Sequence, residues 1–510
     1  MTKLATTQNN AHSDQNTADQ TVDCTGDCTG DQTMDCAGDQ TMDCAGDHAA
    51  TEPERVYKTK PIDVLLAACS ALYLMPFMVS SVNMGLPTIG ADLGASAVQL
   101  GLVGTSYIVT VNIFMLMMGR IGDIIGRRRV FRIGVACFTL STIALSIAPS
   151  VNVFLALRVS QGLGAAMINT SGMAMLVSIF PPEKRGQALG ILTATVYAGV
   201  SSGPVIGGIL TSHFGWRSIF ILAVPMGLLA WGIAMTRLRD EWCDAKGEPF
   251  DFRGGLVYAS SIVCITLGTA FLEQSPHAAW MIVAGLCGLV GFYFVEKHTT
   301  FPIVDVSIFT KSREFTFGCI AAWINFGAVT TIMMLMSFYI QVVQGLSPSK
   351  AGIMLVIQPI TQMLLSPFGG RLADRYPADR MSIVGMSICA LGLFLAVGLD
   401  GNSGIYYPMM VQIIVGIGLA IFSPANALAL MTSVEPRYIG IASGLSGTMR
   451  TLGIATCMLS LTVVFSIFMH GQPVTPDTAP AFLESMHFDF IFFAVLSLAG
   501  VGLSFFRLKR

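Results

Sequence analysis

Apolar stretches long enough to cross a lipid bilayer recur along this chain from residue 63 to the C-terminus. A helix needs about 20 residues to cross a hydrocarbon core about 30 Å thick, and helices satisfy their own backbone hydrogen bonds in lipid. Charged residues make up only 12% of the 510 residues, whereas soluble domains have about 25%. The sequence therefore predicts an all-α integral membrane protein with fourteen spans, at residues 63–83, 97–118, 130–149, 151–179, 186–210, 217–236, 254–272, 278–297, 315–341, 351–371, 379–399, 405–430, 439–468 and 488–507.

Basic residues fall almost entirely on one side of these spans. The loops on that side and the C-terminal tail contain Arg120, Arg127, Arg128, Arg129, Arg132, Lys184, Arg185, Arg237, Arg239, Lys246, Arg253, Lys297, Lys311, Arg313, Arg371, Arg375, Arg380, Arg507, Lys509 and Arg510. The opposite loops contain only Arg217 and Lys350. Loops rich in Lys and Arg stay in the cytoplasm. We therefore expect a multi-pass protein of the plasma (inner) membrane with both termini cytoplasmic.

Residues 1–60 differ from the rest of the chain. They are polar and acidic, and the eight-residue unit DQTMDCAG occurs at Asp31–Gly38 and again at Asp39–Gly46. No apolar period is present, so we expect a disordered tail. Its four cysteines could suggest metal binding, but a structural zinc site needs four converging ligands, and we favour an expanded repeat without a metal.

The two halves of the hydrophobic region repeat one another. The glycines Gly186 and Gly190 recur 254 residues later as Gly440 and Gly444, and GRIGD at Gly119–Asp123 is echoed by GRLAD at Gly370–Asp374. Internal repeats are typical of transporters, whose substrate site lies between the repeated units. We predict a tail (1–60), an N-terminal six-helix bundle (61–240), two inserted helices with linkers (241–313) and a C-terminal six-helix bundle (314–510).

Three motifs resemble those of a known family. They are GRIGDIIGRRR at Gly119–Arg129, LALRVSQGLGAA at Leu155–Ala166 and GVSSGPVIGG at Gly199–Gly208. With the fourteen spans, they make residues 63–510 similar to the major facilitator superfamily, and within it to the fourteen-span drug:proton antiporters of the EmrB/QacA type. The resemblance implies alternating access, and its third motif favours export.

We interpret the first motif as a conformational latch formed by Gly119, Asp123, Arg127 and Arg128. The glycines allow two helix ends to approach closely in a loop. Asp123 can accept from amides at a helix N-terminus or pair with an arginine. The alternative is that the arginines only fix topology, but topology does not require Asp123.

The second motif places a charge inside a span. Arg158 is followed within one turn by Gln161 and Gly162, and a charged residue at this depth costs about 2.5–3.5 kcal/mol on insertion scales. The resemblance implies a role in proton coupling or in the electrostatics of the substrate cavity. The alternative is a structural hydrogen-bond hub. A second intramembrane arginine, Arg450, is close enough to the cytoplasmic end for us to expect snorkelling.

The third motif puts small residues on one stripe of the fifth span. Gly199, Gly203, Gly207 and Gly208 permit close helix packing, and Pro204 removes a backbone hydrogen bond. We expect this stripe to form a tight contact between the two bundles. The alternative is ordinary packing within the membrane.

The proton-binding residue is not evident from the sequence. The antiporters that the chain resembles have an aspartate in the first span, where this chain has Met78. The remaining candidates are Glu273, at the outer end of the seventh span, and Asp489, at the start of the fourteenth. The alternative is that both are solvated carboxylates at the membrane edge.

Neutral amides in the spans predict an adaptable substrate cavity, formed by Asn83, Asn112, Asn169, Asn325, Gln358, Gln362 and Asn426. Interhelical hydrogen bonding is the alternative role for these side chains. We expect the substrate to be a lipophilic or weakly cationic small molecule, and we expect protons and the lipid bilayer to be the other partners of a monomer that binds no nucleic acid. No cofactor, metal site or enzyme activity is predicted. A nutrient uptake carrier is the second functional class, and a non-transporting sensor that uses the tail is the third.

Overall fold

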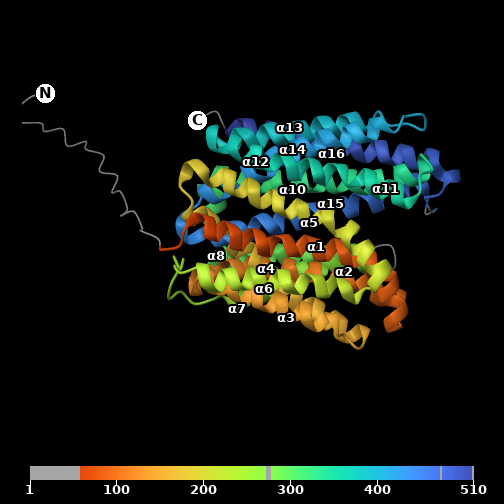
Figure 1. The fold of residues 1–510 in the computed structure, drawn as a ribbon. Coiled ribbons are helices and arrows are strands. Elements are labelled where there is room, and N and C mark those ends of the chain that lie inside the picture. The colour runs from red at the N-terminus through yellow and green to blue at the C-terminus, as the bar shows by residue number, and fades with distance from the viewer. Residues whose placement is uncertain (1–57, 272–276, 471, 473, 508–510) are drawn as a thin grey trace, which may run out of the picture. The chain divides into compact units, whose positions relative to one another are not determined.

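The computed structural model describes residues 58–271, 277–470, 472 and 474–507. Residues 1–57 of the predicted disordered tail and Glu273 thus lie outside the described residues, whereas Thr59, within the predicted tail, is described and buried. Every regular element in the described part is helical, and fourteen helices in it are long and apolar enough to cross a membrane. Figure 1 shows these helices running side by side. The predicted fold class and number of spans are therefore confirmed.

The first six spans pack together, and we call them the N-terminal bundle. They are α1 (Pro61–Leu93), α2 (Ala97–Ile125), α3 (Arg127–Ser146), α4 (Val151–Ile179), α5 (Arg185–Phe214) and α6 (Arg217–Arg237). Helix α1 packs on α5, α6 and α4, and α3 packs on α4 and α6. Helix α2 continues through the GRIGD motif, so the expectation that this motif is a loop was wrong. The chain turns only at Gly126, whose φ is 113°, a conformation that glycine adopts readily.

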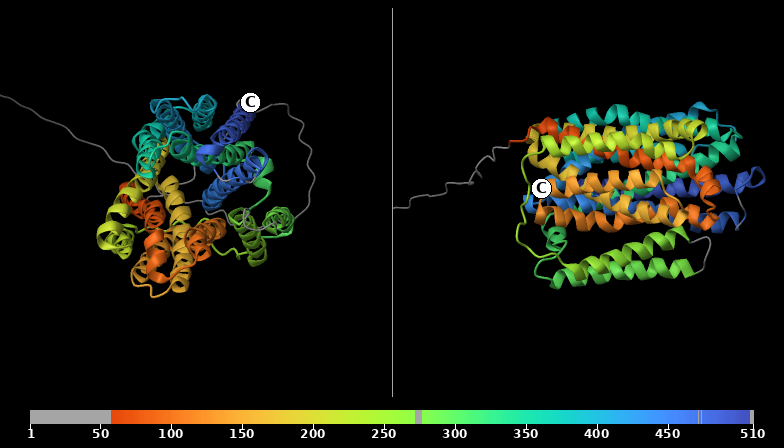
Figure 2. Two further views of the ribbon diagram at one scale, coloured as in Figure 1. Left: turned by 90° about the vertical axis from the view of Figure 1, so that its right-hand side faces the viewer. Right: turned by 60° about the horizontal axis from the view of Figure 1, so that its bottom comes forward.

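Helices α7 (Phe252–Ala270) and α8 (His277–His298) form a hairpin. Along the sequence, this hairpin comes after the N-terminal bundle and before the last six spans. Figure 2 shows this hairpin, in green, at the side of the other helices. Helix α7 contacts α2 and α15 (Ile439–Met469), whereas large apolar side chains of α8 such as Trp280 and Val290 are exposed. Such an apolar outer face fits contact with lipid. A short helix, α9 (Ser307–Lys311), follows.

The last six spans form what we call the C-terminal bundle. Its helices are α10 (Arg313–Phe338), which continues as a π-helical turn η2 (Tyr339–Val343), α11 (Pro348–Leu355) with α12 (Ile357–Arg375), α13 (Ala378–Ala396), α14 (Tyr406–Thr432), α15 and α16 (Ala479–Arg507). Helices α11 and α12 together make one span. The break between them has a local cause, because Pro359 has no N–H to donate to the carbonyl of Leu355.

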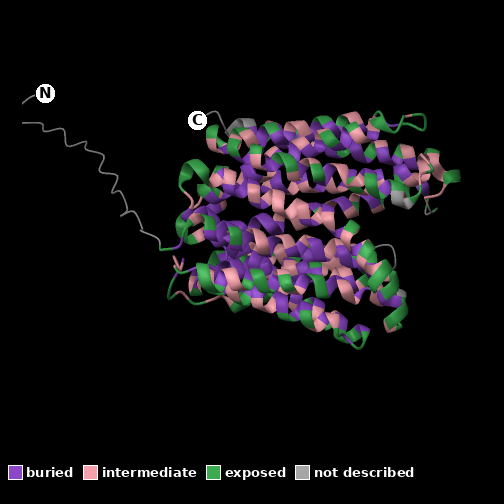
Figure 3. Cartoon of the chain, viewed as in Figure 1, coloured by how far each residue is buried: buried purple, intermediate pink, exposed green. Residues whose placement is uncertain are grey.

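The basic loops gather at one end of the helices, which we call the basic end; α1 and α5 begin there and α2 and α4 end there. Figure 3 shows that buried residues follow the inner faces of the helices and that exposed residues follow the outer faces and the connecting loops. The exposed outer residues include many large apolar side chains. Together with the helix lengths, this pattern fits a multi-pass membrane protein.

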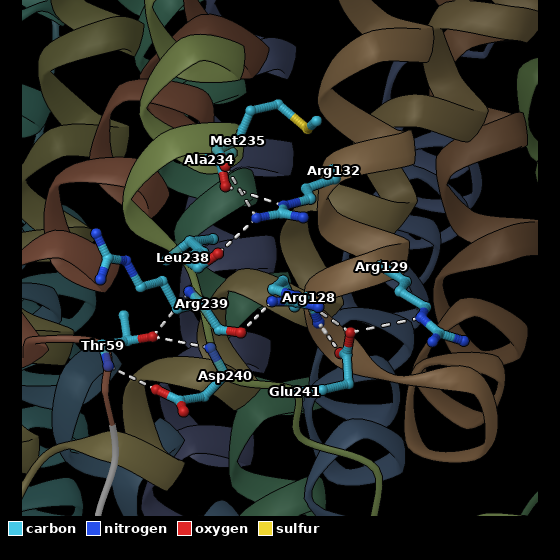
Figure 4. A network of polar contacts seen from close by, with 10 residues as sticks. All are labelled: Thr59, Arg128, Arg129, Arg132, Ala234, Met235, Leu238, Arg239, Asp240 and Glu241. Atoms are coloured by element: carbon cyan, nitrogen blue, oxygen red, sulfur yellow. Dashed lines mark hydrogen bonds and ion pairs between the residues drawn. The ribbon is translucent and has the colours of Figure 1, made fainter.

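A polar network holds the basic end of the N-terminal bundle together (Figure 4). Arg132 of α3 donates to the carbonyls of Ala234, Met235 and Leu238 at the C-terminus of α6, and such capping satisfies carbonyls that have no helical partner. The hydroxyl of Thr59 accepts from the amide of Asp240, and the Thr59 amide donates to the Asp240 carboxylate. Partial burial raises the pKa of Asp240, but these hydrogen bonds outweigh it and hold that pKa below its ordinary value.

Candidate functional site

A cavity of about 300 Å³ lies between the two bundles. Its walls come from the middle of α1, α2, α4 and α5 on one side and of α10, α14 and α15 on the other, with α7 at the edge. Apolar side chains such as Met75, Val111 and Phe326 make up most of the lining. A largely apolar cavity of this size with a few polar groups is typical of a small-molecule site.

Three of the predicted amides line this cavity, namely Asn112, Asn169 and Asn426. Asn112 also joins the bundles, because its Oδ1 accepts from the Thr451 hydroxyl of α15 at 2.6 Å. Asn426 instead accepts from Ser382 within the C-terminal bundle at 3.3 Å. The cavity therefore contains hydrogen-bonding groups from both halves of the repeat.

The other four predicted amides do not line the cavity. Asn83 is exposed on α1, whereas Asn325, Gln358 and Gln362 are buried inside the C-terminal bundle. The cause is the rotation of the helix, since successive residues of a helix are turned by about 100°. Phe326 faces the cavity, so Asn325, one position earlier, faces another helix.

Arg450 is the one charged residue among the described residues that line the cavity. Its guanidinium carbon lies 4.6 Å from the centre of the Phe326 ring, and its Nε is buried without a hydrogen-bond acceptor. Arg450 follows the start of α15 at Ile439 by eleven residues, which corresponds to about 16 Å of helix. The expectation that Arg450 snorkels to the membrane surface was therefore wrong.

Arg158 is buried within the N-terminal bundle rather than in the cavity wall. It donates to Gln161 Oε1 at 2.6 Å and to the carbonyl of Val103 at 3.2 Å. Its guanidinium also lies 4.5 Å from the centre of the Tyr107 ring, and Tyr107 lines the cavity. Gly162 allows α4 to lie close to α2, since a Cβ at residue 162 would be 2.8 Å from the carbonyl oxygen of Tyr107. Arg158 thus reaches the cavity only through Tyr107.

Asp123 connects the two bundles at the basic end. Its Oδ1 accepts from Arg127 Nε at 2.8 Å, and its Oδ2 accepts from the backbone amide of Ile441 at the start of α15 at 3.3 Å. Both contacts expected for Asp123 are present. Gly119 packs directly on the backbone of Gly440, where a Cβ would clash. A carboxylate at a helix N-terminus is favourable, because the first amides have no helical acceptor.

The repeated motif makes the same contact in the other half. Asp374 of α12 accepts from the amides of Gly186 and Gln187 at the start of α5, at 2.6 and 2.8 Å. Gly186 and Gly370 also pack backbone against backbone. The sequence repeat is therefore a repeat of contacts, in which each bundle places an aspartate at a helix start of the other.

The two arginines assigned to the latch behave differently. Arg127 crosses between the bundles, because its Nη2 donates to the carbonyl of Pro436 at 2.9 Å. Arg128 stays within the N-terminal bundle, where its amide and its Nε bind Glu241 at 2.8 and 3.2 Å (Figure 4). Arg128 therefore makes no bridge to the other bundle, and its contacts correct that part of the expectation.

The small-residue stripe of α5 packs on α1 of the same bundle, so the expected contact between the bundles was wrong. A Cβ on Gly199, Gly203 or Gly207 would lie 2.5–2.7 Å from atoms of α1, whereas one on Gly208 would meet nothing within 4 Å. Ser81 of α1 donates to the carbonyl of Gly203 at 2.9 Å. Pro204 has no N–H to donate to the carbonyl of Val200, and it is accommodated within an unbroken helix.

Asp489 is a buried carboxylate in the C-terminal bundle, and Glu296 is a buried carboxylate in the inserted hairpin. Asp489 lies ten residues inside α16, not at its start, and its Oδ1 accepts from Ser460 at 2.6 Å. Its Oδ2 is buried without a partner, as is Oε1 of Glu296 in α8. Glu296 Oε2 accepts from the Val304 amide at 2.9 Å. No pattern in the sequence indicates Glu296, because the linker that contains Val304 cannot be placed from a helix pattern.

Comparison with known proteins agrees with this geometry. The family model described as the Major Facilitator Superfamily matches residues 66–458, and the chain therefore belongs to this superfamily of membrane transporters. The prediction of a transporter rather than an enzyme is confirmed by this membership.

Individual relatives cover most of the chain. The riboflavin transporter RibZ of Clostridioides difficile is 30% identical over 77% of this chain and 85% of its own length. The tetracenomycin C resistance and export protein of Streptomyces glaucescens is 27% identical over 79% and 76%. Among solved structures, the human organic anion transporter MFSD10 superposes with a TM-score of 0.58 at 15% identity, over 87% of this chain and 97% of that one, which supports the fold alone.

Proposed function

We propose that this protein is a secondary active transporter that exports an amphipathic organic compound by alternating access, coupled to proton entry. The cavity between the bundles is the observation on which this proposal rests, together with the reciprocal aspartate contacts at one end of it. A transporter that works by alternating access needs a site that is closed by contacts which can break and re-form. The bundles at 61–240 and 314–510 would move as units, beside the insert at 241–313.

We propose that the basic end faces the cytoplasm, which the excess of Lys and Arg in its loops supports, and that the protein acts as a monomer in the plasma (inner) membrane. With this orientation, the paired contacts of Asp123 and Asp374 close the cavity to the cytoplasm. Breaking them would admit substrate from inside the cell. Removing either contact would therefore change the balance between the two states.

Export is favoured over uptake by two observations. The α5 motif resembles that of exporters, and a relative that matches 79% of this chain is an export protein. Uptake is the second candidate, because another relative at 30% identity is a riboflavin transporter, a name that leaves the direction open. A direct measurement of direction decides between them.

Asp489 is the carboxylate that we propose as the proton-binding group. It is buried deep in α16, and within the described residues no basic side chain forms an ion pair with it. Ionisable groups at such depth are costly and usually functional. The hydroxyl of Ser460, on α15, connects it to the helix that also contains Arg450.

Everted membrane vesicles test direction and coupling together. Their cytoplasmic face is outside, so an exporter accumulates substrate in the lumen when the lumen is acidic. We expect accumulation that a protonophore abolishes and that empty-vector vesicles lack. Uptake into right-side-out vesicles but not into everted ones would contradict export, and accumulation that is insensitive to the protonophore would contradict proton coupling.

A further inference from the structure

The central cavity presents hydrogen-bond donors without acceptors. Three buried polar atoms in its wall have no partner, namely Arg450 Nε, Asn112 Nδ2 and Tyr107 Oη. The two nitrogens can only donate, and the hydroxyl can donate as well as accept. Buried donors without partners are rare in proteins and require an explanation. A ligand that brings acceptors would satisfy all three.

The charge of the cavity wall is positive, which also favours a ligand that brings hydrogen-bond acceptors. Arg450 is positive, and no Asp or Glu is present among the described residues of the wall. Arg158 adds a second positive charge behind the Tyr107 ring, 4.5 Å from its centre. A cation would meet repulsion from both arginines without a carboxylate to offset it. These charges argue against the weakly cationic substrate expected from the sequence.

The apolar part of the wall indicates the rest of the ligand. Phe326 lies beneath the Arg450 guanidinium at 4.6 Å, and the flexible side chains of Met75, Met115 and Met458 line the same cavity. Methionine sulfur and aromatic rings pack well against aromatic ligands. An aromatic body would therefore find apolar contacts beside the charged group.

We propose that the substrate is an aromatic organic anion whose acceptor group binds the Arg450 guanidinium. This proposal rests on the proposed transport function, because it assigns the ligand of the same cavity. Guanidinium binds planar oxyanions through paired hydrogen bonds. Arg450 would thus act as a specificity-determining residue.

Binding to the purified full-length protein in nanodiscs tests the proposal without requiring transport. The probes are two xanthene dyes of similar size, the anion fluorescein and the cation rhodamine 123, measured by fluorescence anisotropy. A thermal-shift panel of aromatic carboxylates, each with its amine analogue, widens the search. We expect fluorescein and members of the carboxylate series to bind at least about tenfold more tightly than their cationic analogues, as expected for a charged hydrogen bond.

Variants identify the residue responsible. Arg450→Gln should weaken binding of the anions about ten- to hundredfold and leave rhodamine 123 unchanged or tighter, whereas Arg450→Lys should keep part of the anion preference. The matched control is Arg313→Gln, which removes the same charge from an exposed position at the start of α10. Equal loss of both dyes would indicate a structural role for Arg450.

Three results would overturn the proposal. They are equal binding of anions and cations by the wild type, no binding by any anion of the panel, and an anion preference that survives in Arg450→Gln. Failure of the transport function would look different. In that case anions would bind through Arg450, but everted vesicles would not accumulate them.

Discussion

The backbone amide of Gly186 donates a hydrogen bond of 2.6 Å to the carboxylate of Asp374, across the boundary between the two bundles. The amide of Gln187 donates to the same carboxylate at 2.8 Å, and its counterpart in the other half is the amide of Ile441, which donates to Asp123 at 3.3 Å. Each carboxylate thus lies at the start of a helix in the opposite bundle, where unpaired amides and the helix dipole favour a negative charge. In the alternating-access cycle proposed above, the helices would separate when the cavity opens to this end, so each contact would stabilise only the closed form.

Asp374→Asn should therefore shift the protein toward the form that is open at the basic end. An uncharged amide loses the interaction with the helix dipole, worth up to about 2 kcal/mol, so the ratio of the two forms should change by about 5–30-fold. Transport should fall while the amount of protein in the membrane stays the same. Spin labels at the exposed positions Arg129 and Arg380 would report longer distances.

Asp123→Asn should have the same sign of effect, since the two contacts are equivalent. Asp477→Asn, at an exposed position in the loop before α16, is the control for removal of a charge. Wild-type transport together with an unchanged distance distribution in both variants would exclude the role as a latch.

The glycines at this boundary provide a second prediction. A methyl group on Gly186 would lie 2.5 Å from the carbonyl oxygen of Gly370 and 2.7 Å from Asp374 Oδ1. Gly186→Ala should therefore hold the bundles apart and reduce transport more than Asp374→Asn does. Gly232→Ala is the matched control, because a Cβ at this helical glycine of α6 meets nothing within 4 Å. Equal transport by the two alanine variants would contradict the close approach.

The sequence predicted the number of spans and the equivalence of Gly186 with Gly440. The first follows from the length of the apolar stretches and the second from the spacing of residues along the chain. It did not predict how far each helix is rotated about its axis. That rotation separates Phe326 in the cavity wall from Asn325 behind it. Packing between helices fixes this angle, and helices that are apolar all round have no polar face from which to read it.

The same limitation explains the errors at α5 and α15. The stripe of Gly199, Gly203 and Gly207 indicates that a helix approaches closely, but it does not identify α1 as that helix. The sequence could have predicted that Arg450 does not snorkel, because its distance from the helix start exceeds what snorkelling can span. The basic end was predicted most fully at Asp123, where the chemistry of a carboxylate beside a helix start limits the possible partners.

Packing of α5 on α1 leads to a third prediction, which concerns stability. A Cβ on Gly203 would lie 2.5 Å from the Cβ of Ser80, and one on Gly208 would meet open space. Gly203→Ala should lower the melting temperature of the detergent-solubilised protein, since overpacking usually costs about 1–3 kcal/mol. Gly208→Ala should melt as the wild type does. If both variants were equally stable, the assignment of α1 as the partner of this stripe would be wrong.

The fourth prediction concerns proton coupling through Asp489. The groups that face it from α15 are Ser460, which donates to it at 2.6 Å, and Cys457, and neither is a cation. His487 on the same helix contacts the carbonyl of Leu399 instead. A carboxylate in these surroundings can exchange a proton during the transport cycle, whereas an amide of the same shape cannot.

Asp489→Asn should therefore abolish accumulation driven by a pH gradient and leave exchange of labelled for unlabelled substrate at equal pH on both sides near the wild-type rate. This pair of assays separates coupling from folding, because a misfolded protein fails in both. The variant should also lose the dependence of its exchange rate on pH, since the titrating group is gone. Accumulation at the wild-type level in Asp489→Asn would show that the coupled proton binds elsewhere. The next variant to measure would then be Glu296→Gln, which changes the buried carboxylate of α8.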